Sequence, residues 1–146
     1  MTESGTGQLL FGFVRHWSRR AAEGDATAAE QGRLVQVIEA VHALTGRGEP
    51  VTVNAVADEI GIDQSGASRL VRDAAQAGHL DITTSSIDGR RRQLTLTETG
   101  RTLLTHAHAW QEEVFGQLTQ GWSQRRRDEF HRAMADLIAR SYELDR

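Results

Sequence analysis

The chain has 146 residues and a formal net charge of −3, with 17 arginines, no lysine and no cysteine. This length fits one domain with a core of its own, and the lack of cysteine excludes disulfides, thiolate metal sites and thiol redox chemistry. No apolar run approaches the roughly 20 residues of a membrane span. The N-terminus has no secretory layout, so we expect a cytoplasmic protein without membrane attachment.

Helical spacing of apolar residues predicts a first helix over residues 8–22. Thr27 and Glu30 have the form of a capping box, which predicts that a second helix starts at Thr27 and ends near Gly46. These two helices make up the predicted helical segment 8–46.

Two short helices joined by a turn follow in the sequence. Thr52 can cap the first, and Gly61 can end it through a left-handed residue. Asp63 or Ser65 can cap the second, which is expected to stop at Gly78. Two short helices joined by a short turn containing glycine match a helix-turn-helix.

A β-hairpin is predicted next. Leu80 and Ile82 alternate with polar residues, which predicts a half-buried strand, and residues 92–96 mark the returning strand. The Asp-Gly pair at 88–89 is the strongest short hairpin signal, because a type I′ turn needs positive φ at both central positions. A helix-turn-helix followed by a cationic hairpin is the order of a DNA-binding winged helix.

The last two helices complete the predicted helical segment 98–142. Thr97 is expected to cap a long helix, and Ser123 to start the last one after Gly121. The first and last helices carry apolar stripes that a small winged module cannot easily cover, which favours a C₂ homodimer. The alternative, in which both helices fold back onto their own core, stays open.

The sequence therefore predicts a mainly α fold with a small antiparallel β wing, in one domain over 1–146. A winged helix-turn-helix at 51–97 is flanked by N- and C-terminal dimerisation helices. Between Gln64 and Arg101, six arginines stand against four acidic residues, a local net charge of +2 in a chain of net charge −3. Positive charge is thus concentrated where the motif lies.

Residues 51–104 resemble the MarR family of bacterial transcription regulators. Residues 56–71 look like the helix-turn-helix of that family, and Asp88-x-Arg90-Arg91, continuing to Leu96-Thr97-x-x-Gly100, matches its wing signature. The resemblance implies a homodimer that binds a pseudo-palindromic operator. Members commonly act as repressors that release double-stranded DNA when a small, often aromatic, anion binds. The missing cysteine excludes the peroxide-sensing branch of the family.

The second helix of the motif is expected to enter the major groove, with side chains near its N-terminus at the base edges. Gln suits adenine, Arg suits guanine, and Ser65 with the free amides of the first turn suits phosphate. Gly66 stands where the family more often has a larger residue; it costs about 1 kcal/mol of helix propensity or permits close approach to DNA. The expected contacts are Gln64, Ser65, Gly66, Ser68, Arg69 and Arg72.

The wing is expected to reach a minor groove through Arg90, with Asp88 positioning its guanidinium. Arg91 and Arg92 alternate along the strand, so one of them should meet phosphate. The alternative is an ordinary charged hairpin that resists edge aggregation.

An effector pocket is implied by the resemblance alone, between the dimer helices and the DNA-binding head. Arg20 or His16 would bind an anion there, although aromatic residues at helical spacing are also typical of a plain core. The residues expected at this pocket are Phe13, His16, Trp17, Arg20, Val41, His42 and Trp110.

No metal, cofactor or enzyme active site is expected. His106 and His108 point apart on a helix and cannot chelate one ion. Arg125–Arg127 can be a solvated face or a second contact with DNA or a partner. The remaining alternative for the whole chain is a winged-helix protein-interaction module without DNA binding, which the acidic net charge and Gly66 favour.

Overall fold

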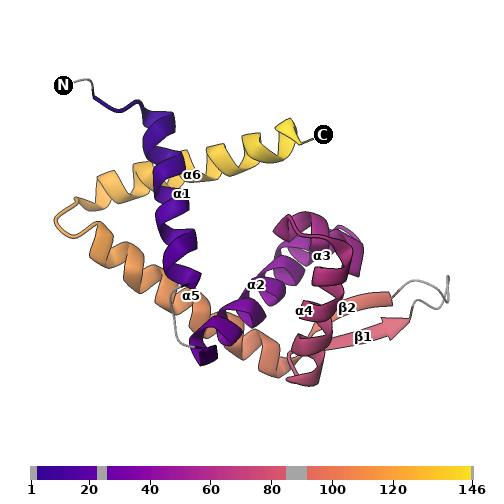
Figure 1. Cartoon of the computed structure of the whole chain (residues 1–146). Coiled ribbons are helices and arrows are strands. Elements are labelled where there is room, and N and C mark those ends of the chain that lie inside the picture. Colours follow the sequence, from indigo (N-terminus) through magenta and orange to yellow (C-terminus); the bar gives the residue numbers. More distant parts are fainter. Residues whose placement is uncertain (1–2, 23–25, 85–91, 146) are drawn as a thin grey trace. The chain divides into compact units, whose positions relative to one another are not determined.

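The computed structural model describes residues 3–22, 26–84 and 92–145. Six helices and one two-stranded antiparallel sheet make up this part of the chain, which confirms the predicted fold class (Figure 1). None of the described helices is long and apolar enough to cross a membrane. The elements are α1 (Thr6–Ala22), α2 (Ala26–Gly46), α3 (Val53–Ile60), α4 (Gln64–Gln76), β1 (Leu80–Thr84), β2 (Arg92–Leu96), α5 (Glu98–Leu118) and α6 (Gln124–Leu144).

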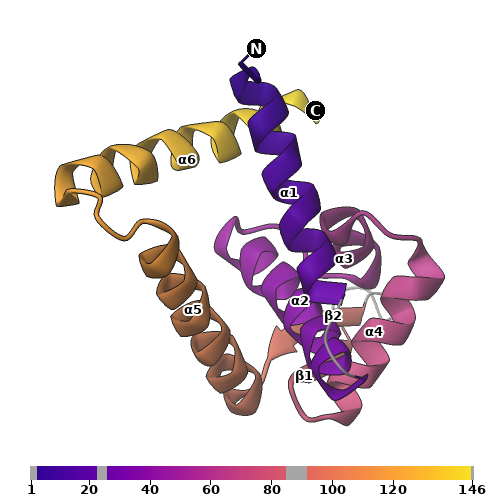
Figure 2. The same ribbon diagram turned by 60° about the vertical axis from the view of Figure 1, so that its left-hand side comes forward.

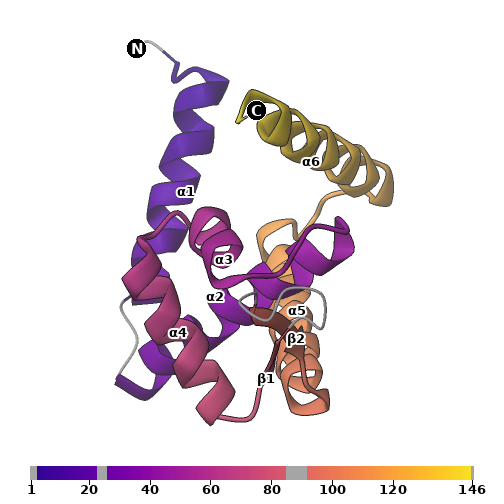
Figure 3. The ribbon, with the colours of Figure 1, turned by 90° about the vertical axis from the view of Figure 1, so that its right-hand side faces the viewer.

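Local capping chemistry sets the bounds of α3 and α4. The Thr52 hydroxyl accepts a hydrogen bond from the Ala55 amide at 3.1 Å, and Gly61 ends α3 with φ +82°. Asp63 caps α4, and Gly78 follows that helix with φ +85°. These caps confirm the predicted helix-turn-helix of α3 and α4. After it, α4 leads through a short turn into β1 (Figure 3).

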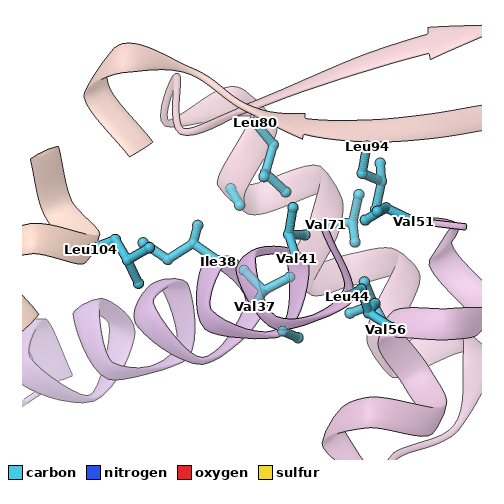
Figure 4. Close-up of a cluster of buried hydrophobic side chains, with 12 residues drawn as sticks. Val37, Ile38, Val41, Leu44, Val51, Val56, Val71, Leu80, Leu94 and Leu104 are labelled. Atoms are coloured by element: carbon cyan, nitrogen blue, oxygen red, sulfur yellow. The ribbon is translucent and has the colours of Figure 1, made fainter. Parts of the chain in front are cut away.

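A cluster of aliphatic side chains holds this module together. Val37, Ile38 and Val41 project from α2 without exposed surface and meet residues of α3, α4, both strands and the start of α5 (Figure 4). Leu94 of β2 is also fully buried, and its amide donates to the Val51 carbonyl at 2.8 Å. The strands are thus fixed to the segment that precedes α3.

On β1, only the inner end of the strand is buried. Leu80 pairs with Leu96, and Ile82 pairs with Leu94, in an antiparallel register. Leu80 and Leu94 are buried, whereas Ile82 is 42% exposed, so the predicted half-buried strand is wrong beyond its first residue. The period-2 pattern gives the face of a strand, but the core extends only to Leu80 on β1.

The junction between β2 and α5 explains the Thr97-x-x-Gly100 pattern. The Thr97 hydroxyl accepts from the Gly100 amide at 3.0 Å and donates to the Gly78 carbonyl. A Cβ on Gly100 would lie 2.2 Å from the His79 carbonyl oxygen. Glycine is therefore required for α5 to start against the turn between α4 and β1.

The start of α2 differs from the sequence prediction. Thr27 lies inside α2, which begins at Ala26. A capping residue has a non-helical backbone, so Thr27 is not the cap of this helix. The residue before α2, Asp25, lies outside the described residues.

The chain divides by its internal contacts into two compact units, Met1–Ala107 and His108–Arg146. In the second unit, α5 leads through a short turn into α6 (Figure 2). Ser123 caps α6 as predicted, and its hydroxyl accepts a hydrogen bond from the Arg126 amide at 3.1 Å. Phe130 stacks on Phe115 and packs edge-on against Trp122. A single domain over the whole chain stays a prediction.

Candidate nucleic-acid interface

The helix α4 has one buried face and one exposed polar face. Ala67, Val71 and Ala74 are buried against the rest of the module. The expected DNA contacts lie on other positions of the helix: Gln64, Ser65, Arg69 and Arg72 are exposed, and Gly66 and Ser68 are half-buried. The structure therefore brings these six residues together on one short helix.

The two arginines of this face are available for an external partner. Neither Arg69 nor Arg72 forms an ion pair with another residue of the described ranges. A guanidinium in water is free to form bidentate contacts with a guanine edge or with phosphate. The exposed face of α4 thus has the chemistry of a nucleic-acid contact.

An acidic side chain occupies the N-terminus of the same helix. The Asp63 carboxylate accepts from the Ser65 hydroxyl at 2.7 Å and from the Gly66 amide at 3.1 Å. These hydrogen bonds, that of Ser65 first, hold the pKa of Asp63 below its usual range. The Ser65 hydroxyl donates a hydrogen bond to Asp63 in this conformation, whereas the sequence predicts that it contacts a phosphate.

The geometry at Gly66 gives a further reason for a glycine at this position. A Cβ on Gly66 would lie 2.7 Å from Oδ1 of Asp63. The capping carboxylate therefore occupies the space that a larger side chain would take. The sequence predicts Asp63 or Ser65 as the cap, and the structure shows that it is Asp63. The contact with Gly66 is not predicted, although the spacing Asp63-x-Ser65-Gly66 is its signal.

The wing contributes one described residue to the expected interface. Arg92 is exposed at the start of β2, where it pairs with Thr84 of β1. The other expected wing contacts, Asp88, Arg90 and Arg91, lie outside the described residues.

The residues expected at an effector pocket fall into three groups. On α1, the Trp17 ring lies 6.2 Å from Phe13 and 5.9 Å from His16 between ring centroids. On α2, Val41 is fully buried in the aliphatic core and His42 is exposed. Trp110 is an exposed residue of α5 in the other unit, and the side chain of Arg20 lies outside the described part.

The three arginines at the start of α6 all interact within their own unit. Arg125 pairs with Glu129 at 3.1 Å, and Arg126 lies 4.0 Å above the Trp122 ring. Arg127 donates to the Thr119 carbonyl at 3.0 Å, beside the end of α5. The contacts of Arg126 and Arg127 hold the corner between α5 and α6, whereas the pair of Arg125 lies within α6. Among the described residues, no group of three His, Asp or Glu side chains is placed to hold a metal ion.

Part of the chain matches the model of a known protein family. Residues 32–91 match a family model described as MarR family. A MarR family transcriptional regulator from Silicibacter pomeroyi is 16% identical, with a TM-score of 0.67 over 96% of each chain. A MarR-family regulator from Rhodococcus sp. is 19% identical, with a TM-score of 0.63 over 93% of this chain and 96% of that one.

A third solved structure contains DNA. The S. aureus MepR–DNA complex is 16% identical, with a TM-score of 0.58 over 90% of this chain and 96% of that one. These likenesses show the fold. The comparison with curated proteins gives no match.

Proposed function

We propose that the chain, whose residues 32–91 match the MarR family model, is a ligand-responsive repressor of that family, active in the cytoplasm as a homodimer on a pseudo-palindromic operator. The observation that carries DNA binding is the exposed surface of α4, with Arg69 and Arg72 away from its buried face and Gln64 exposed at its first residue. Arg69 would read guanine in the major groove, Gln64 would read adenine, and Arg72 would contact the backbone.

The homodimer is supported by apolar side chains that stay exposed in the single chain. On α6, Leu137 and Ile138 are each about half exposed, and no residue of this helix is buried. On α1, Phe11 and Phe13 are more than half exposed. A second copy covering these faces would remove apolar surface from water and set two α4 helices against two half-sites.

The proposed repressor would release its operator when a small ligand binds. A regulator bound over a promoter blocks transcription, and a ligand that binds the DNA-free form better lowers operator affinity. The aromatic group of Phe13, His16 and Trp17 on α1 suits a small aromatic anion, since the rings offer flat apolar contacts and a histidine can carry positive charge.

The deciding experiment is fluorescence anisotropy with labelled duplex from the region upstream of the protein's own gene. A scrambled duplex of equal length and salt from about 50 to 200 mM are the controls. The expected result is tight, sequence-dependent binding that weakens steeply with salt, by a protein that sediments as a dimer. Aromatic carboxylates are then titrated in to look for release. Equal, weak binding to both duplexes, repeated with duplexes selected from a random library, would contradict the proposal and favour a protein-interaction module.

A further inference from the structure

The N-terminus of α4 already carries an anion of the chain's own. Both oxygens of the exposed Asp63 carboxylate are engaged, Oδ1 by the Gly66 amide and Oδ2 by the Ser65 hydroxyl. A DNA phosphate at the same place would meet a second negative charge and would find both donors occupied. This end of α4 therefore disfavours the phosphate contact that a helix N-terminus usually offers.

An exposed apolar side chain lies beside this carboxylate. A Cβ placed on Gly66 would lie 3.7 Å from Cδ1 of Ile62 and 2.7 Å from Oδ1 of Asp63, so both atoms border the same space. Ile62 is 37% exposed in the turn between α3 and α4. Because residue 66 has no side chain, a hydrogen-bond acceptor and an apolar group stand next to each other at the edge of α4.

This pair matches one base edge of the major groove. Cytosine presents its N4 amino donor beside the apolar C5 edge. Thymine and guanine present acceptors, which a carboxylate repels, and the amino group of adenine is flanked by the N7 acceptor.

We propose that Asp63 is a specificity-determining residue that accepts a hydrogen bond from N4 of a cytosine, with Ile62 against the C5 edge, while its charge keeps phosphate away. This inference rests on the proposed DNA-binding function and adds a residue to its contact surface. It also assigns a role to Gly66, whose missing side chain leaves room for both neighbours.

The test uses the full chain and the variant Asp63→Asn. Asparagine caps helices as well as aspartate does, so the variant keeps the start of α4 but loses the charge and gains a donor. Operators are selected from random duplexes with both proteins, and the affinity for each base at every position is measured by competition. Wild type is expected to prefer C·G at one position of each half-site, and Asp63→Asn to lose about tenfold of that preference. Its affinity for scrambled duplex should rise.

A matched variant separates the position of the charge from its mere presence. Asp73→Asn removes one exposed charge from the other end of α4 and should keep the C·G preference. Thermal unfolding checks that all variants fold.

The outcomes separate this inference from the proposed function. If wild type selects an operator and Asp63→Asn keeps the same C·G preference, Asp63 is only a helix cap and the inference is overturned, while the regulator stands. Loss of the preference in Asp73→Asn as well would also overturn it, because charge alone would then be responsible. If wild type selects no sequence, the proposed function fails and this inference fails with it.

Discussion

The helices α4 and α6 both carry arginines, but the surroundings of these arginines differ. On α4, Arg69 and Arg72 are exposed and form no ion pair with the rest of the described chain. On α6, Arg125, Arg126 and Arg127 bind a carboxylate, an indole ring and a backbone carbonyl of their own unit. The denser arginine cluster, that of α6, is thus the one whose side chains contact other residues of the chain.

The comparison shows that arginine density does not locate a DNA contact. A guanidinium already engaged in the fold would have to give up that contact before it could bind phosphate, whereas a solvated one gives up only water. The arginines on α4 are therefore expected to control DNA affinity, and those on α6 to control stability. Three measurements test this difference between the arginines of α4 and α6, and a fourth tests the cap of α4.

The largest effect is expected from Arg69→Ala. Losing a bidentate contact with a base should lower operator affinity about 10- to 100-fold, corresponding to about 1–3 kcal/mol. Anisotropy with the operator duplex measures the loss, and Arg125→Ala on α6 is the matched control with unchanged affinity expected. Equal losses in the two variants would remove the distinction between the helices.

Arg127→Ala should lower stability rather than DNA affinity. The half-buried guanidinium donates to the Thr119 carbonyl near the end of α5, and a charged hydrogen bond of this kind contributes about 1–2 kcal/mol. Denaturant unfolding at fixed protein concentration measures the change. The exposed Arg132 of the same helix provides the control, since Arg132→Ala should leave the unfolding midpoint in place.

A smaller loss is expected from Arg126→Ala, which removes the cation–π contact with Trp122. At an exposed site such a contact contributes about 0.5–1 kcal/mol to the free energy of unfolding. The same unfolding experiment detects it, and Trp122→Leu combined with Arg126→Ala should cost no more than Trp122→Leu alone. Additive losses would mean that the two side chains do not interact.

The smallest effect concerns the pH dependence of the α4 cap. The pKa of Asp63 is lowered in the folded state by Ser65 and Gly66, so its contribution to stability is complete above the ordinary carboxyl pKa of about 4 and is lost as pH falls through the lower folded value. Wild type should therefore exceed Asp63→Ala in stability at pH 7, and the gap should narrow below about pH 4. A gap that stays constant down to pH 2 would contradict the assignment.

Much of the fold could be predicted because its signals are local. Thr52, Gly61 and Ser123 act at helix ends through hydrogen bonds or backbone angles within a few residues of themselves. The strand that starts at Leu80 can be predicted for the same reason, from its alternating pattern. The exposure of Ile82 cannot be predicted from that pattern, because it depends on where the core ends along the hairpin.

The candidate site shows the same division. The residues of α4 can be predicted from the helical period, and the capping role of Asp63 from its side-chain chemistry, because both are local. The tertiary structure adds contacts that no local pattern predicts: Arg126 lies over the Trp122 ring, and Arg127 donates to the Thr119 carbonyl. Gly100 likewise lies against the His79 carbonyl, which leaves no room for a Cβ. Those contacts join residues from different elements, and no local propensity encodes the distance between them.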